Sequence, residues 1–463
     1  MLKQLLMRRL LLLVFCLPFM AQAQVNQDSV TIKKMVDEVM TNGKAYDLLR
    51  ELTKKIGGRL AGSPQQQNAA IWGKRNMDAL NPDAVYMQPC KTPNWQRGGK
   101  DFAAIVGLNG KPTIQKLEVL ALGNSLGSNG LVEADVLAVA NFDELEKRKD
   151  EVKGKIVYYN SEFDPTLIQT FKAYGASNAY RGIGASRAAK YGAVGVMIHS
   201  LSTAPDNAPH TGGMRYDSAY PKIPAVALGP NDAKALYAQA KKGTVRAQMQ
   251  TYGFFLPDAD ENNVVAELKG TEHPEEIITI GGHLDSWDVN EGAHDDGAGV
   301  VQTMEVLRTM KALNYQPKHT IRFVLFANEE NGGKGGAKYA ELAKLNKEKH
   351  ILALESDEGG FTPRSIAITC SPAQFARFQK WNPFLKPYGT EITTGGGGAD
   401  IGPLTGYDKS IIMSSMIPDS QRYFDLHHAK TDVFENVNKR ELLLGAANIA
   451  AFVYLVDQYG VNP

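Results

Sequence analysis

Short apolar segments rich in β-branched residues recur through the second half of the chain, and helical patterns separate them. Between the second and third segments, residues 299–313 place apolar side chains on one face at spacings of three and four, as in a helix packed on a sheet. Such alternation predicts an α/β fold built on a doubly wound, mostly parallel sheet. The expected strands are 264–268, 277–280, 321–327, 351–354, 366–368 and 411–413.

Two adjacent carboxylates follow the segment 321–327, in the sequence TIRFVLFANEENGGKGG. The apolar part reads as a buried parallel strand, so Glu329 and Glu330 are expected at the carboxyl edge of the sheet, where α/β proteins bind ligands. Adjacent carboxylates repel each other, and this costs stability unless a cation or a proton-transfer role offsets it. The pair therefore raises the question of a bound cation.

Other predicted strand ends carry residues that can bind metals, in the strings HLDS (283–286), HDDGAG (294–299), ESD (355–357) and HHAKTD (427–432). Each string alone is weak evidence, because a lone histidine is more often an ordinary hydrogen-bonded residue. Asp295 and Asp296 could equally cap the helix that follows them. Together, imidazoles and carboxylates at successive strand ends favour Zn²⁺, and paired carboxylates favour two ions.

In order and spacing, the strings HLDS, HDDGAG, NEE, ESD and HHAKTD resemble the di-zinc exopeptidase family of aminopeptidases and glutamate carboxypeptidases, and most of all its carboxypeptidase Q (plasma glutamate carboxypeptidase) type. The similarity extends over most of the chain and implies the zinc exopeptidase fold with two Zn²⁺ ions. By position, the resemblance implies the following metal ligands: His283 and Asp357 on one ion, Glu330 and His428 on the other, and Asp295 between them.

The same resemblance implies roles beyond the ligands. Glu329 would be the general base, His427 would line the site as a donor to the oxyanion, and Asp285 would support the site from behind. The glycine-rich loop that ends in Asp400 resembles a substrate-facing loop, although it could also be an ordinary surface loop. The remaining candidates to anchor a substrate are Arg422 and Tyr423. His294 is given no role.

The N-terminus predicts export from the cytoplasm. Lys3, Arg8 and Arg9 precede an apolar run, and Ala21-Gln22-Ala23 follows it as a cleavage site, so residues 1–23 are expected to be a cleavable signal peptide. The run is shorter than the roughly 20 residues that a membrane span needs. We therefore expect a periplasmic or secreted protein. Residues 442–456 are also apolar but short, and they are expected to form a buried terminal helix.

A change in composition and in the pattern of elements between residues 111 and 251 predicts a second domain. There, short strands alternate with small-residue helices and with loops rich in Gly, Asn and Pro, and carboxylate and histidine clusters are sparse. This segment resembles the protease-associated domain. The expected organisation is a peptidase domain of residues 24–110 and 252–463, with residues 111–251 inserted into it.

The net charge limits the classes of partner that we expect, and the cysteine content limits the possible disulfides. Loss of the signal's three cations lowers Lys plus Arg from 51 to 48 against 50 Asp plus Glu, which gives no electrostatic footprint for nucleic acid or an anionic membrane. Cys90 and Cys370 would remain, and whether they pair is open. A homodimer is implied by the resemblance alone.

The expected function is a zinc exopeptidase that hydrolyses short peptides, dipeptides or N-terminal residues. Two alternatives share the scaffold: a catalytically inactive binding module, and a glutaminyl cyclase with a single zinc ion. Both are disfavoured because the chain retains the base and every ligand position of the di-zinc motif.

Overall fold

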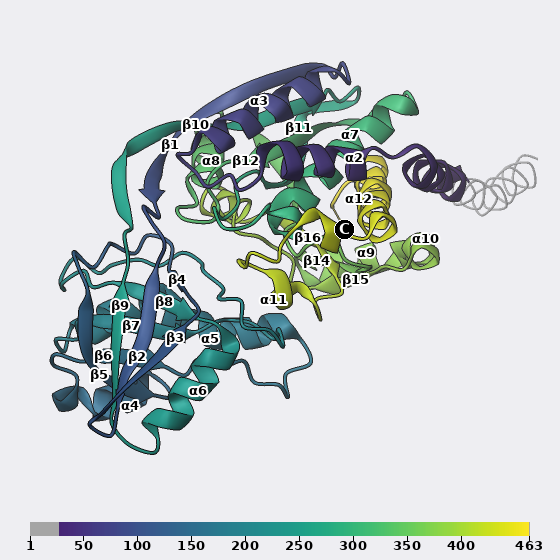
Figure 1. The fold of residues 1–463 in the computed structure, drawn as a ribbon. Coiled ribbons are helices and arrows are strands. Elements are labelled where there is room, and N and C mark those ends of the chain that lie inside the picture. The colour runs from purple at the N-terminus through teal and green to yellow at the C-terminus, as the bar shows by residue number, and fades with distance from the viewer. Residues whose placement is uncertain (1–26, 463) are drawn as a thin grey trace, which may run out of the picture.

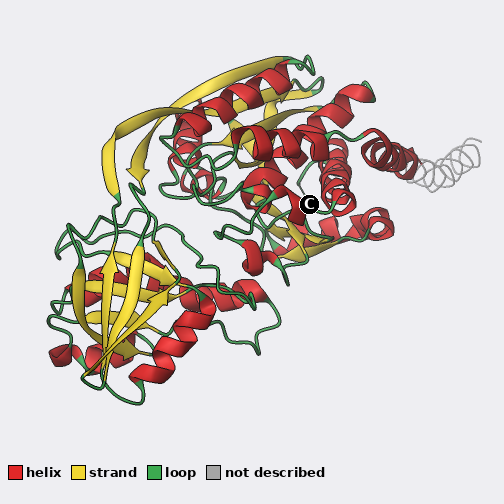
Figure 2. Cartoon of the chain, viewed as in Figure 1, coloured by secondary structure: helices red, strands yellow, loops and turns green. Residues whose placement is uncertain are grey.

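The computed structural model describes residues 27–462, so the predicted signal peptide lies outside the described residues. Two eight-stranded sheets organise the chain, and they occupy separate parts of the molecule (Figures 1 and 2). The fold is therefore mixed α/β. In spatial order, the first sheet consists of β1 (Ala84–Gln96), β10 (Phe254–Leu268), β12 (His319–Phe326), β11 (His273–His283), β13 (Lys349–Glu355), β16 (Ile412–Pro418), β14 (Pro363–Thr369) and β15 (Glu391–Thr394).

The centre of the first sheet is parallel, as predicted. Strands β12, β11, β13 and β16 run in the same direction, whereas β10 and β14 pair antiparallel with β12 and β16. The sheet is thus mixed rather than mostly parallel at its margins. All residues of β12 are buried, which explains its continuous apolar sequence.

Helices cover this sheet and supply most of its core. They are residues 27–42, α2 (Ala45–Glu51), α3 (Pro64–Asp78), α7 (Ala298–Ala312), α8 (Lys334–Asn346), α9 (Pro372–Phe378), α10 (Asn382–Leu385), α11 (Tyr423–Leu426) and α12 (Lys439–Tyr459). The predicted C-terminal helix is confirmed as α12, which Asn438 caps through its side chain. It is long and apolar enough to span a membrane, but 83% of its apolar window is buried inside the protein, as expected for a core helix.

The second sheet is formed entirely by residues between β1 and β10. Its strands, in spatial order, are β3 (Lys111–Leu117), β2 (Phe102–Leu108), β9 (Val245–Gln250), β5 (Val132–Val139), β6 (Ile156–Tyr159), β7 (Gly195–His199), β8 (Ala225–Leu228) and β4 (Val119–Ala121). Its helices are α4 (Phe142–Lys147), α5 (Thr170–Ala189) and α6 (Pro230–Ala240). The sheet begins at Phe102, nine residues before the boundary expected from sequence texture.

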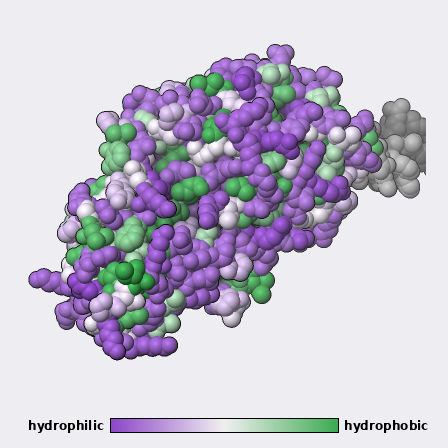
Figure 3. Space-filling model, in the orientation of Figure 1, coloured by the Kyte–Doolittle hydropathy of each residue, from purple (hydrophilic) through white to green (hydrophobic). Residues whose placement is uncertain are grey.

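The long antiparallel pair of β1 and β10 leads from one sheet toward the other (Figure 1). The visible face of the molecule is mostly hydrophilic, with scattered apolar patches (Figure 3). Cys90 is buried in β1 and Cys370 is partly exposed, and both are free thiols.

Candidate metal centre and active site

The parallel strands bring the predicted acids and imidazoles to one edge of the first sheet. Strand β11 ends at His283, Glu329 and Glu330 follow β12, and Asp357 comes two residues after the end of β13. Because β12, β11 and β13 are neighbouring parallel strands, their carboxyl ends meet at this edge. The loop after α11 adds His427 and His428.

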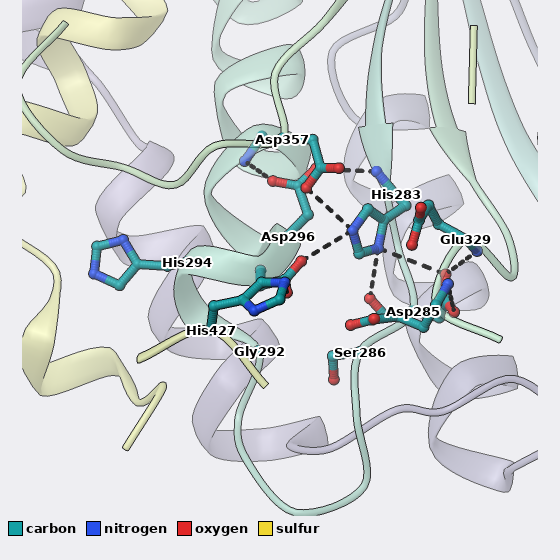
Figure 4. Close-up of polar contacts among 12 residues, drawn as sticks. His283, Asp285, Ser286, Gly292, His294, Asp296, Glu329, Asp357 and His427 are labelled. Atoms are coloured by element: carbon teal, nitrogen blue, oxygen red, sulfur yellow. Dashed lines mark hydrogen bonds and ion pairs between the residues drawn. The ribbon is translucent and has the colours of Figure 1, made fainter. Parts of the chain in front are cut away.

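Asp295 lies at the centre of the cluster, with one group of residues on each of its carboxylate oxygens. Its Oδ1 is 3.1 Å from Nε2 of His283. The same Nε2 is 3.3 Å from Oδ1 of Asp357, and Figure 4 shows His283 and Asp357 side by side. Its Oδ2 is 3.1 Å from Nε2 of His428, which in turn is 3.0 Å from Oε2 of Glu330. The five residues assigned as ligands by position therefore form two groups that share Asp295.

The cluster is buried, and its electrostatics are dominated by carboxylates. Burial opposes protonation of His428, but Glu330 and Asp295 raise the pKa of this imidazole to about 10. Burial and the charge of Asp295 raise the pKa of Glu330 to about 7. Asp357 and the other acids likewise raise the pKa of His283 against the effect of burial. The carboxylates therefore favour positive charge at this site.

The donor set fits zinc. Oε1 of Glu330 is buried and has no hydrogen-bond partner among the described residues, while the buried Oδ2 of Asp295 and Oδ1 of Asp357 face the Nε2 atoms of His428 and His283, at 3.1 and 3.3 Å. Unpartnered buried carboxylate oxygens are costly unless a cation or a proton satisfies them. The ligand atoms of His283, Asp295 and Glu330 also lie within 4.8 Å of one another. A mixed imidazole and carboxylate set suits Zn²⁺.

The neighbouring Asp296 has a different task. Its Oδ2 accepts a hydrogen bond from the backbone of His283 at 3.0 Å, and its Oδ1 accepts one from Gly299 at 2.9 Å. Asp296 thus binds the first turn of α7 and ties it to the end of β11. The peptide bond between Asp295 and Asp296 is cis. With both its oxygens engaged, Asp296 is less suited than Asp295 to bind a cation.

Asp285 joins two strand ends. Its Oδ1 accepts a hydrogen bond from the backbone of Glu329 at 2.9 Å, and its Oδ2 accepts one from Glu330 at 3.3 Å. The same Oδ1 is 3.6 Å from Nδ1 of His283, which lies 3.0 Å from the backbone oxygen of Asp285 (Figure 4). An acceptor at Nδ1 leaves Nε2 of His283 free to bind a metal. Burial raises the pKa of Glu329.

His427 and His428 stack with ring centroids 3.5 Å apart. Nε2 of His427 is farther from Oδ2 of Asp295, at 3.7 Å, than that of His428, and its buried Nδ1 has no partner among the described residues. Burial and the adjacent His428 lower the pKa of His427, so this imidazole is neutral. His428 therefore makes the shorter contact with Asp295.

A cavity of about 230 Å³ opens onto the cluster. The part of the chain that forms the first sheet and its helices contributes the lining residues Asp295, Glu329, Glu330, Asp357, Tyr423, Phe424, His427 and His428. The segment that forms the second sheet contributes Phe171, Tyr174, Arg181 and Gly213. Helix α5 lies close to α11 in Figure 1, and the stacked rings of Phe171 and Tyr423, with centroids 5.4 Å apart, join them. Both parts of the chain therefore shape the cavity.

Two candidate substrate anchors lie elsewhere. Asp400 is 1% exposed and is not one of the residues that line the cavity. Arg422 lies over the ring of Phe361 and is 3.2 Å from Glu441 at an exposed position. Tyr423, by contrast, does line the cavity.

The glycine-rich loop before Asp400 wraps around a carboxylate that sequence reasoning overlooked. Glu355 accepts hydrogen bonds from the backbones of Ala399, Asp400 and Ile401 at 2.9–3.0 Å. A Cβ atom at Gly398 would collide with the Glu355 carboxylate. The absence of a side chain at Gly398 thus allows the loop to pack directly against the Glu355 carboxylate. The position of Glu355, at the end of a strand and just before Asp357, was the available signal.

Asp432 was also overlooked as a functional residue. Its carboxylate accepts hydrogen bonds from the backbones of His294 and Asp295 at 2.8 and 3.1 Å, which holds the segment that carries the central carboxylate. The ring of His294 points away from the cluster around His283 (Figure 4) and stacks on Phe361 with centroids 4.1 Å apart. His294 is thus a packing residue, in keeping with the absence of a predicted role.

Comparison with known proteins places this chain in a family. The model of Peptidase family M28 matches residues 263–453, which carry all the predicted ligands. Carboxypeptidase Q from Bos taurus is 34% identical over 438 residues, covering 93% of this chain and 88% of that protein. Carboxypeptidase Q from Homo sapiens is 33% identical over the same length.

Solved structures of related fold support the same family. The crystal structure of a Peptidase M28 precursor from Shewanella amazonensis superposes with a TM-score of 0.88 at 30% identity, covering 95% of this chain and 99% of that one. A zinc aminopeptidase from Bacillus subtilis shares the fold, with a TM-score of 0.64 at 19% identity, covering 90% of this chain and 95% of that one. The chain therefore belongs to peptidase family M28 and is a zinc metallopeptidase.

Proposed function

We propose that this protein is an exported di-zinc exopeptidase that hydrolyses dipeptides and other short peptides. The observation that carries the proposal is the shared carboxylate of Asp295, which has His283 with Asp357 on one side and His428 with Glu330 on the other. Each side offers an imidazole and a carboxylate besides the bridging oxygen. A single-zinc site, as in the glutaminyl cyclase alternative, would not need both sides.

In this proposal His283 and Asp357 would hold one zinc ion, Glu330 and His428 would hold the other, and the two groups would share Asp295. Bound zinc would lower the pKa of a coordinated water and polarise the scissile carbonyl group of the peptide. Asp285 fixes the orientation of His283 through Nδ1, and Thr211 does the same for His428, whose Nδ1 lies 3.3 Å from the Thr211 carbonyl oxygen.

Glu329 is the proposed general base. Its side chain lines the cavity, and Asp285 fixes its backbone, so the carboxylate is placed beside the ligands without being one of them. It would accept a proton from the attacking water and deliver that proton to the leaving amine. His427 lines the same cavity and would donate a hydrogen bond to the developing oxyanion from its neutral ring.

Arg181 is the proposed anchor of the substrate's C-terminal carboxylate. Its side chain is 9% exposed, and its Nε has no hydrogen-bond partner among the described residues. Its Nη1 lies 3.4 Å from Nδ1 of His428. When His428 binds a metal through Nε2, Nδ1 carries a proton and cannot accept from Arg181. Nη2 of Arg181 donates to the Tyr174 hydroxyl, so Nη1 and Nε are the nitrogens that need another acceptor. A carboxylate is the acceptor that a guanidinium binds most strongly.

The small cavity limits the length of the substrate. About 230 Å³ accommodates a short peptide, and the aromatic rings of Phe171, Tyr174 and Tyr423 would contact its side chains. An anchor at Arg181 favours substrates with a free C-terminus, and thus dipeptidase action over release of N-terminal residues from long chains. Asp400, buried beside Glu355, is not used as an anchor in this proposal.

We further propose that residues 111–251 form an inserted protease-associated domain, with the strand β2 before them completing its sheet. The exit of the chain after β1, its return at β10, and the self-contained second sheet support this organisation. The insert would close one side of the cavity and contribute Arg181. A signal peptide at residues 1–23 would export the protein to the periplasm or the medium.

The test is a substrate panel combined with metal analysis. Purified protein should contain two zinc ions per chain and should cleave free dipeptides, while C-terminally amidated dipeptides are cleaved far more slowly. Cleavage of long peptides and of amidated substrates as fast as free dipeptides would contradict the substrate class. A protein that binds zinc but cleaves none of the panel would instead favour an inactive binding module.

A further inference from the structure

The turn of residues 57–63, which precedes α3 and is remote in sequence from every proposed ligand, contains an arginine that contacts the loop between two of those ligands. The Arg59 side chain is fully buried. Its Nε donates to the carbonyl of Leu284, its Nη1 to that of Glu291 at 2.7 Å, and its Nη2 to that of Gly292 at 3.0 Å. Every nitrogen of the guanidinium therefore binds a backbone carbonyl of one short segment.

That segment, residues 284–292, connects the first proposed ligand to the bridging one. His283 lies immediately before it, and Asp295 follows three residues after it. The labelled Ser286 and Gly292 mark its path below the cluster (Figure 4). The relative position of His283 and Asp295 thus depends on the conformation of this loop.

Backbone contacts reinforce the side-chain contacts. The backbone nitrogen of Arg59 donates to Oγ of Ser286 at 3.2 Å, and the carbonyl of Arg59 accepts from the backbone of Ser286 at 3.4 Å. The turn also approaches the loop very closely, because a Cβ atom at Gly58 would lie 2.8 Å from the carbonyl oxygen of Asn290 and 3.0 Å from that of Trp287. Only a residue without a side chain permits this approach.

The contacts of Arg59 differ from those of an ordinary buried arginine. Among the described residues, no carboxylate oxygen lies within ion-pair distance of its guanidinium, although Asp285 and Asp432 are close enough for their charges to act on it. A buried charge without an ion pair costs stability, and the three carbonyl acceptors offset part of that cost. A planar guanidinium with fixed donor directions also imposes a geometry on those carbonyls, which a lysine cannot do.

We propose that Arg59 is a positioning residue for the metal centre, which fixes residues 284–292 so that His283 and Asp295 are correctly spaced before zinc binds. The inference rests on the metal site of the proposed function and adds to it a residue outside that site. Removal of the guanidinium would allow the loop to relax and would weaken zinc binding without removing any ligand.

The test measures zinc affinity by competition with a chromophoric chelator, in Arg59→Met and Arg59→Lys. Both variants should bind zinc about 10- to 100-fold more weakly than the wild type, as expected for the loss of groups that orient ligands. Saturating zinc should restore much of their activity. Gly58→Ala, which keeps the arginine but forces the turn away from the loop, should weaken zinc binding in the same direction.

Arg322→Met is the matched control. Arg322 is also buried, at 6% exposure, but it pairs with Glu267 and Glu348 and contacts no proposed ligand. Its loss should destabilise the fold without changing zinc affinity. Wild-type zinc affinity in folded Arg59→Lys would overturn the proposal, as would an equal loss of affinity in Arg322→Met. If the Arg59 variants do not fold, wild-type affinity in Gly58→Ala overturns it.

A second control separates this inference from the metal site itself. His283→Ala removes a proposed ligand and should lose zinc far more severely than any variant of the turn. If His283→Ala loses zinc while the Arg59 variants do not, the metal site stands and the inference about Arg59 fails. If His283→Ala binds zinc as the wild type does, the proposed metal site itself is contradicted.

Discussion

Nε2 of His428 lies 3.1 Å from Oδ2 of Asp295, although the two residues come from distant parts of the sequence. This contact joins the loop after α11 to the segment before α7 and places the second group of proposed ligands on the free side of the central carboxylate. The chemistry of the site therefore depends on how precisely these two segments meet.

Glu329→Gln should abolish turnover while the protein keeps its zinc. The amide occupies the same space but cannot take a proton from water, and loss of a general base costs about 10²- to 10⁴-fold in kcat. Activity and zinc content should be measured on the same preparation. Glu341→Gln, on the exposed face of α8, is the control and should retain full activity. Wild-type kcat in Glu329→Gln would assign the base elsewhere.

Arg181→Met should raise KM for free dipeptides by about 10- to 100-fold, which corresponds to the roughly 1.5–3 kcal/mol of a hydrogen bond to a charged group. The variant should treat C-amidated dipeptides as the wild type does, because those substrates never make the contact. Arg187→Met, on the same helix but lying over Phe142, is the control. Equal losses on free and amidated substrates would argue that Arg181 only supports the cavity.

Gly398→Ala should destabilise the protein because its new methyl group would meet the carboxylate of Glu355. Overpacking of this kind costs about 1–3 kcal/mol. Gly402→Ala is a matched control four residues away, since nothing lies within 4 Å of the position its Cβ would take. Denaturant unfolding of both variants tests this explanation of the glycine-rich loop, and equal stabilities would refute it.

Glu348 should contribute stability that depends on pH. Burial opposes its ionisation, but His350 and Arg322 lower the pKa of this carboxyl group to about 2 from an ordinary 4.5. A depressed pKa gives stability that is fully present above pH 4.5 and is lost as the pH falls toward 2. Glu348→Gln should therefore cost about 3 kcal/mol at pH 7 and about half of that at pH 3. Unfolding of the metal-free protein at both pH values measures the difference, and a cost independent of pH would contradict it.

Six strands of the first sheet, but not β1 and β15, were predicted from sequence, and β12 is the clearest because all its residues are buried, which leaves a continuous apolar signal. The proposed ligands were chosen from the order of the motifs, and the motifs with His283, Glu330 and Asp357 lie at or just after the ends of β11, β12 and β13. The antiparallel pairing of β10 with β12 and of β14 with β16 was not predicted, because the sequence of a strand does not show in which direction it runs. Pairing of this kind is decided by tertiary contacts.

Residues that act through backbone contacts could not be predicted. Arg59 binds backbone carbonyl groups more than 200 positions away. Every residue has such a group, so the sequence does not indicate which of them will accept a hydrogen bond. Arg181 reaches the cavity only because α5 packs beside α11, and that packing depends on the placement of the second sheet against the first. Asp400 was expected to face the substrate, but the backbone hydrogen bonds from its loop to Glu355 hold it in the interior.

The most direct test of the two-metal account is zinc stoichiometry, measured by inductively coupled plasma mass spectrometry on the wild type, Glu330→Ala and Asp295→Ala. We expect two zinc ions per chain in the wild type, about one in Glu330→Ala, and near zero in Asp295→Ala because both ions lose the shared carboxylate. One ion in the wild type, or two retained in Asp295→Ala, would contradict the account.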